Sequence, residues 1–222
     1  MPGPRLSRLL FVAWLLLLAA PASAQTEITD ATVDDLLRRA EEAFRQGRAA
    51  EAAYTVERVA AWAKHIRDVA PGSRNPAEEY AFAERISLRV LATIGRTLGP
   101  DHESAFNALL GLATHYIEQR REAEADPLPA RAMRVAERAP APSEDHRRAA
   151  IARVLGQQGL LEEGRGRQGD AEVCYRQALD IVLALPPRLR GGAGPAVRNF
   201  LRFLRATNRE HEASAIEGRF AR

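Results

Sequence analysis

The chain has 222 residues, of which 46% are hydrophobic and 27% are charged, and its formal net charge at pH 7 is +3. Two of its arginines lie in the first ten residues, so the rest of the chain is nearly neutral, which argues against a nucleic-acid partner. Lys64 is the only lysine, and the arginines mostly alternate with Glu and Asp, as on a solvated helical surface. Cys174 is the only cysteine, which excludes an internal disulfide.

The N-terminus has the pattern of a secretory signal peptide. Two arginines precede an apolar run over 9–20, and small residues at Ala22 and Ala24 fit the A-x-A cleavage rule. The alternative is a membrane anchor, but a helix over this run reaches only about 18 Å, against about 30 Å for the hydrocarbon core. We expect a signal peptide over 1–24, cleaved after Ala24. The mature chain, 25–222, would then lie in the bacterial periplasm or outside the cell, without a membrane span.

From residue 30 onward the hydrophobic pattern is helical nearly throughout, and it contains no period-two run long enough for a strand. The predicted fold class is therefore all-α. The expected helices cover about 31–46, 49–68, 77–98, 103–120, 124–138, 145–164, 168–184, 194–207 and 210–221.

Cap and turn residues set the expected helix boundaries. Asp30 and Thr32 offer N-caps for the first helix, and Asp101 is the candidate N-cap of the helix that begins near 103. Two prolines and a Gly-Gly pair between 184 and 194 predict a loop there.

An acid–alanine pair recurs along these helices. The pairs are Glu51-Ala52, Glu124-Ala125, Asp170-Ala171 and Glu212-Ala213, with a reversed match at Ala83-Glu84. The last three alanines are separated by 46 and 42 residues, and Ala83 lies 42 residues before Ala125. A fixed period in this range is typical of stacked supersecondary units, none of which buries its apolar face alone. We expect an α-solenoid of antiparallel helix hairpins that forms one elongated domain.

The repeated segments resemble the tetratricopeptide repeat, and more narrowly the variant found in kinesin light chains. The matching segments are Leu98-Gly99-Pro100-Asp101-His102, Gln46-Gly47-Arg48, Arg165-Gly166-Arg167, and Tyr175 with Ala178-Leu179. The resemblance covers most of the mature chain and implies a right-handed superhelix of hairpins. The implied units are a first hairpin over 31–69, an irregular helix over 77–98, and repeats over 103–138, 145–184 and 194–221.

Small residues recur where paired helices of this family approach each other closely. These residues are Ala113, Gly159, Ala125, Ala171 and Ala213. The chain also departs from the family's pattern, because Ala52 and Ala83 are only 31 residues apart, too few for a regular first helix between them. Pro129 replaces a usual aromatic residue and Glu162 a usual Tyr. We expect the first hairpin to stack irregularly, and the insertion over 139–142 to bend the array.

The resemblance implies a concave groove, lined by the first helix of each hairpin, in which partner peptides commonly lie extended. The implied groove residues are Asn107, Leu110, Gln157, Arg198, Asn199, Arg202 and Arg205. Asn199 matches the second Asn of the family's motif and can donate to and accept from a peptide backbone. The three arginines share one helical face and could grip acidic side chains or a C-terminal carboxylate. The alternative for these arginines is an ordinary solvated face.

The sequence contains no recognisable catalytic, metal or cofactor site. The histidines are scattered, and helix capping explains the Asp-His pairs at Asp101 and Asp145 better than a metal site does. The glycine-rich segment 164–169 joins two helices without the strand that precedes a nucleotide-binding loop. We predict an exported, non-enzymatic scaffold for a protein or peptide partner. The alternatives are an enzyme subunit or ligand-binding protein whose site the motifs do not reveal, a nucleic-acid-binding repeat, and homo-oligomerisation through the last helix.

Overall fold

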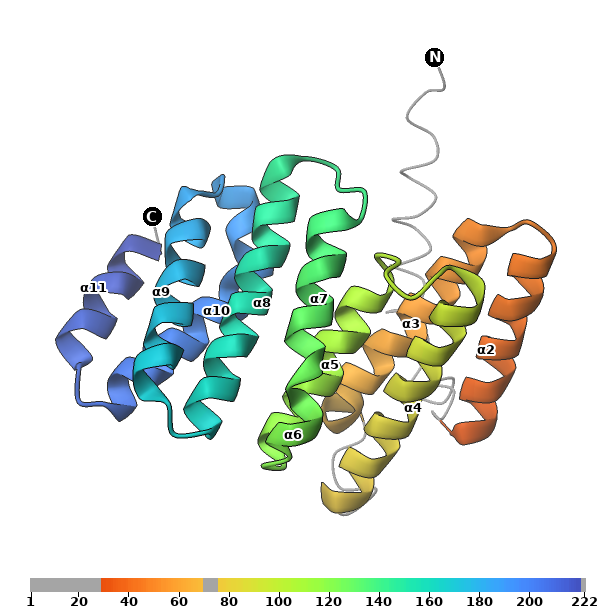
Figure 1. Cartoon of the computed structure of the whole chain (residues 1–222), viewed down its shortest axis with the longest axis horizontal. Helices are drawn as coiled ribbons and strands as arrows, with labels where there is room; N and C mark the ends of the chain where they lie inside the picture. The colour runs from red at the N-terminus through yellow and green to blue at the C-terminus, as the bar shows by residue number, and fades with distance from the viewer. Residues whose placement is uncertain (1–28, 70–75, 221–222) are drawn as a thin grey trace.

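The computed structural model describes residues 29–69 and 76–220, and all its regular elements in these ranges are helices. The prediction of an all-α chain is therefore confirmed, whereas the predicted signal peptide lies outside the described residues. Within these ranges, no helix combines the length and apolarity that crossing a bilayer requires. The helices (Figure 1) are α2 (Asp30–Arg45), α3 (Ala49–Val69), α4 (Pro76–Thr97), α5 (Ala105–Glu118), α6 (Glu122–Ala125), α7 (Pro127–Arg138), α8 (Glu144–Gly164), α9 (Gln168–Ala184), α10 (Pro187–Ala206) and α11 (Glu210–Phe220).

The helices follow one another through the molecule in the order of the sequence, with α2 at one end and α11 at the other (Figure 1). Besides these sequential neighbours, α3 contacts α5, α5 contacts α8, and α8 contacts α10. These contacts join α3, α5, α8 and α10 into one continuous row of helices. In this row α3 contacts α4 and α5 as α5 contacts α7 and α8. The segment that precedes Ala83 thus supplies a full helix to the row.

The buried apolar side chains form two clusters, and α8 contributes to both. The first cluster extends from α2 to α7 and includes Val154 and Leu161 of α8. The second cluster takes Ala152 of α8 and continues through α9, α10 and α11, with Tyr175 and Phe200 among its fully buried members. Burial of these side chains is what stabilises a chain of otherwise polar, arginine-rich helices.

The small residues of the repeat lie at close helix contacts, as the sequence predicted. Ala113, Ala125, Ala171 and Ala213 are completely buried. A Cβ atom added to Gly159 in α8 would lie 2.5 Å from the Tyr175 ring of α9, closer than carbon atoms approach without a clash. The hydrogen side chain of Gly159 therefore sets the separation of these two helices.

Three helix starts differ from the sequence prediction. The N-cap of α2 is Thr29, whose hydroxyl accepts from the backbone N–H of Thr32, so Asp30 lies in the first turn. At α5, Asp101 does not cap the helix, which begins only at Ala105 after a turn. At α8, Ser143 provides the cap, so the following Asp-His pair is helical and does not lie in a turn. In each case a neighbouring hydroxyl or turn competes successfully with the expected cap.

The largest difference is at α10, which begins at Pro187 and not near 194. Proline is tolerated in a first helical turn because its missing N–H has no partner there. Arg190 fastens this turn by donating to the backbone carbonyls of Leu183 and Leu185 at 3.2 and 3.1 Å. The predicted loop is therefore helical. Conversely, the helix expected over 124–138 is divided into α6 and α7 next to Pro127.

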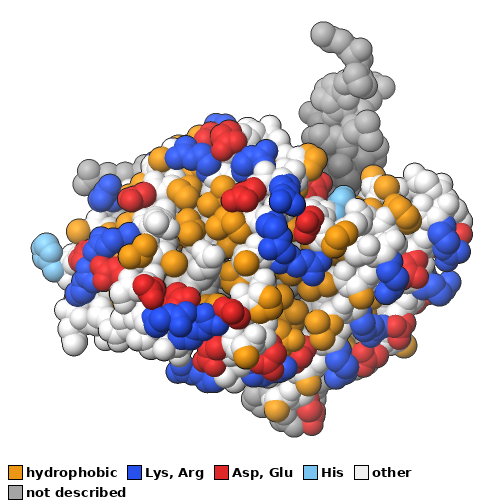
Figure 2. Space-filling model, in the orientation of Figure 1, with side chains coloured by type: hydrophobic (Ala, Val, Ile, Leu, Met, Phe, Trp, Pro, Cys, Tyr) orange, Lys and Arg blue, Asp and Glu red, His pale blue; other side chains and the backbone are white. Residues whose placement is uncertain are grey.

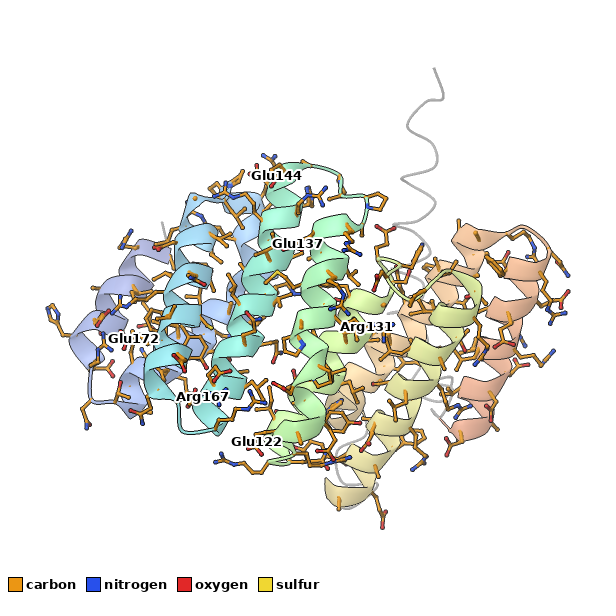
Figure 3. All side chains as sticks on the ribbon, in the orientation of Figure 1. Glu122, Arg131, Glu137, Glu144, Arg167 and Glu172 are labelled. Atoms are coloured by element: carbon orange, nitrogen blue, oxygen red, sulfur yellow. The ribbon has the colours of Figure 1, made fainter. Side chains whose placement is uncertain are left out.

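Ion pairs connect neighbouring helices at the surface. Arginines and acidic side chains lie side by side over the face shown in Figure 2. Glu172, which lies between α9 and α11 in Figure 3, accepts from Arg176 and Arg209 at 2.7 and 2.8 Å. The pairs that join α2 to α4 are Asp30–Arg85, Asp30–Arg89, Asp34–Arg89 and Glu41–Arg96. Most described arginines are thus already paired with a carboxylate, which makes the unpaired ones informative.

Candidate binding groove

A groove of about 710 Å³ crosses three helices of the row, α5, α8 and α10. Its walls combine apolar side chains with amides, arginines and glutamates. The lining residues are Asn107, Leu110, Gly111, Thr114, Ile117, Glu118, Arg120, Arg153, Gln157, Leu160, Glu163, Gly164, Pro195, Ala196, Arg198, Asn199 and Arg202. Within each helix these positions are mostly three or four residues apart, so each helix presents one face to the groove.

The groove positions repeat along the chain at the same steps as the buried alanines. Gly111, Gln157 and Asn199 are separated by 46 and 42 residues, and all three line the groove. Asn107 precedes Arg153 by the same 46 residues. Equivalent positions of successive repeats thus form adjacent parts of one surface.

The structure brings together six of the seven residues that the sequence nominated for partner binding. Asn107, Leu110, Gln157, Arg198, Asn199 and Arg202 all line the groove. Arg205 does not, because its guanidinium binds Glu210 and Glu217 at 3.3 and 2.7 Å. Helix α11 supplies these acids, so Arg205 contributes to the packing of the last two helices.

Arg202 is also paired within the chain. Its two terminal nitrogens donate to the two carboxylate oxygens of Glu163 at 2.9 and 2.7 Å, and the Tyr175 hydroxyl donates to the same carboxylate at 2.9 Å. The bond to Glu163 raises the pKa of Arg202, and burial raises the pKa of Tyr175. This bidentate pair joins α8 to α10 and neutralises Arg202 at the groove wall.

Arg153 is a groove residue that the sequence reasoning missed. Its guanidinium donates to Asn107 Oδ1 at 2.8 Å and lies 4.8 Å from the centroid of the Phe106 ring. It makes no ion pair with any described carboxylate, and burial lowers its pKa. The register offered a signal, because Arg153 occupies the repeat position of Asn107, which was nominated.

Two further arginines leave the groove electropositive. Arg198 and Arg120 are exposed and have neither an ion pair nor a hydrogen bond within the described part of the chain. Four arginines and two glutamates line the groove, so the formal excess is two positive charges. Because Arg202 and Glu163 cancel each other, the remaining charge lies on the other three arginines.

Gln157 lies among these arginines with half of its amide satisfied. Its Nε2 donates to Thr114 Oγ1 at 2.7 Å, while the Thr114 hydroxyl donates to the Leu110 carbonyl at 2.9 Å. Since the Thr114 hydrogen is used in this way, its oxygen must accept, which fixes the orientation of the Gln157 amide. The remaining atom, Gln157 Oε1, is buried without a hydrogen-bond partner.

The groove is equipped for binding and carries no evident catalytic group. Its described lining includes no Ser, Cys, His or Lys, and no described cluster of His, Cys, Asp and Glu could hold a metal ion. No protein-family model matches the chain, and no curated protein is significantly similar to it. The function must therefore be argued from the groove.

Proposed function

We propose that the protein is an exported, non-enzymatic scaffold of the tetratricopeptide-repeat type, an α-solenoid that binds a protein or peptide partner along this groove. The observation that carries the proposal is the groove itself, which is lined by repeat-related positions on α5, α8 and α10. The row of contacts from α3 to α10 supports the stacked arrangement. The apolar run and A-x-A site at the N-terminus support export.

The dimensions of the groove suit a short extended peptide. Packed helices lie about 8–10 Å apart, so the distance from α5 across α8 to α10 is about 20 Å. An extended chain covers this distance with about six residues. The half-buried amide of Asn199 and the exposed Arg198 lie along this path. A peptide in the groove would thus meet apolar, amide and guanidinium groups in turn.

A small-molecule ligand is the second candidate. The groove volume of about 710 Å³ falls within the range of about 300–1,000 Å³ that is typical of small-ligand sites. This reading would make the chain a ligand-binding protein or an enzyme subunit. The peptide reading is preferred because the lining extends over three repeats without closing around one centre.

Affinity capture from the native host tests the proposal. The whole gene is expressed with a C-terminal tag, and the N-terminal sequence of the exported protein is determined to test cleavage after Ala24. Wild type is compared with Arg198→Ser/Asn199→Ala, whose changes lie in the groove, and with Arg188→Ser/Arg219→Ser, whose exposed arginines lie outside it. A partner that is lost only from the groove variant supports the scaffold. Equal recovery by all three proteins would remove the groove from the proposal.

A further inference from the structure

We infer that the groove selects acidic peptides, and that Arg153 and Arg198 bind the carboxylate of an Asp or Glu side chain while Gln157 Oε1 accepts a backbone N–H next to it. This inference rests on the proposed function and specifies the ligand chemistry of the same site. It assigns the selectivity to Arg153, which the repeat pattern alone did not nominate.

The environment of Arg153 is the first argument. A partly buried guanidinium is costly unless an anion compensates it, and no described carboxylate does so. Asn107 satisfies one donor and the Phe106 ring covers one face. A guanidinium has five N–H donors in a planar fork, so several remain for a ligand. The stacking on Phe106 holds this fork in place before any ligand arrives.

The contrast with Arg202 is the second argument. Both arginines line the same groove, yet Arg202 is saturated by the carboxylate of Glu163. The chain thus shows at Arg202 how a guanidinium in this groove is satisfied, namely by both oxygens of one carboxylate. Arg153 and Arg198 lack such a partner within the described residues. A carboxylate from outside the chain would complete the same kind of pair.

Gln157 is the third argument, because it points to a ligand that offers a hydrogen-bond donor as well as an acid. Its buried Oε1 accepts no bond, and Thr114 fixes the amide so that this atom cannot exchange places with Nε2. Leaving a buried acceptor without a donor is unfavourable. A simple inorganic anion could not supply that donor. A peptide supplies a backbone N–H within a residue of each acidic side chain.

Two defined peptide pools test the inference. Both pools are N-terminally labelled with fluorescein, amidated at the C-terminus and long enough to cross the groove. One pool has Glu at two fixed central positions, and the other has Gln at the same positions. Amidation removes the C-terminal carboxylate, so any difference between the pools comes from the acidic side chains. Binding is measured by fluorescence anisotropy at low and high salt.

We expect wild type to bind the Glu pool about tenfold more tightly than the Gln pool at low salt, and less selectively at high salt. Arg153→Gln should abolish most of this preference. Arg188→Gln, which changes an exposed arginine outside the groove, should retain it. Gln157→Met should weaken both pools alike, since the backbone N–H is common to both. Circular dichroism verifies that each variant is folded.

The possible failures are distinguishable. If wild type binds both pools with equal affinity, the acidic selectivity is refuted while the peptide-binding function stands. If neither pool binds, the peptide-binding function is refuted together with the inference. If the preference survives in Arg153→Gln, the carboxylate is not bound where we place it, and the inference is overturned.

Discussion

Replacing Gly159 by alanine should destabilise the protein, although alanine is normally the better helix residue. The new Cβ would lie 2.5 and 2.6 Å from two carbons of the Tyr175 ring. That ring is completely buried, with its centroid 5.7 and 5.5 Å from those of Phe200 and Phe203, and its hydroxyl is bonded to Glu163. The ring therefore has no open space into which to move.

The size of the effect follows from two opposing contributions. Overpacking a well-filled core costs typically about 1–3 kcal/mol, and contacts this short belong to the upper part of that range. The gain from Gly to Ala in a helix is about 1 kcal/mol. We expect a net loss of about 2 kcal/mol in the free energy of unfolding, from the balance of these two contributions.

Gly95→Ala is the matched control, because Gly95 lies in α4 and its added Cβ would have no neighbour within 4 Å. This variant should be more stable than wild type by about 1 kcal/mol. Urea unfolding followed by circular dichroism, with linear extrapolation to water, measures both changes. A Gly159→Ala protein at least as stable as wild type would refute the reasoning, since it would mean that the contact with Tyr175 does not limit the helix separation.

Three further predictions concern ion pairs. Arg121 lowers the pKa of Glu84 by hydrogen bonding, so this pair stabilises the fold at neutral pH and the contribution is lost as pH falls through the lowered pKa; Arg121→Gln should flatten the acid limb of urea midpoint against pH, and an unchanged limb would count against it. Asp30→Asn should cost about 1 kcal/mol at low salt and less at high salt, because exposed pairs are weak and screened; midpoints independent of salt would contradict this. Arg202→Gln should cost about 1–2 kcal/mol in urea unfolding, yet leave the preference for the Glu pool in place, and loss of that preference would show that Arg202 binds the ligand.

The helices were predictable from the sequence where the apolar period and a cap agreed, as at α9, whose bounds match the prediction. The prediction was wrong between 187 and 194, where two prolines and a Gly-Gly pair indicated a loop. Local residue preferences are weak, and tertiary contacts override them. Here the bonds from Arg190 to the end of α9 supply such contacts. No local pattern announces a bond of that kind.

The groove was predictable as a set of positions but not as a set of charges. The repeat placed Arg198 and Arg202 on the same wall, and both lie there. Their different states depend on Glu163, which is held by Tyr175 of α9, and such a three-helix arrangement has no signature in sequence spacing. Arg205 was lost to the groove because α11 folds back and presents two glutamates to it.

The groove lies across the boundary between the two hydrophobic clusters. Helix α5 belongs to the first cluster, α10 to the second, and α8 has side chains in both. Because each close-packed cluster resists deformation internally, the easiest distortion of the molecule is a tilt of one half against the other about α8. A peptide that contacts α5 and α10 together would brace this joint like a strut. Part of its binding energy would then appear as mechanical stiffness of the whole chain, felt far from the groove itself.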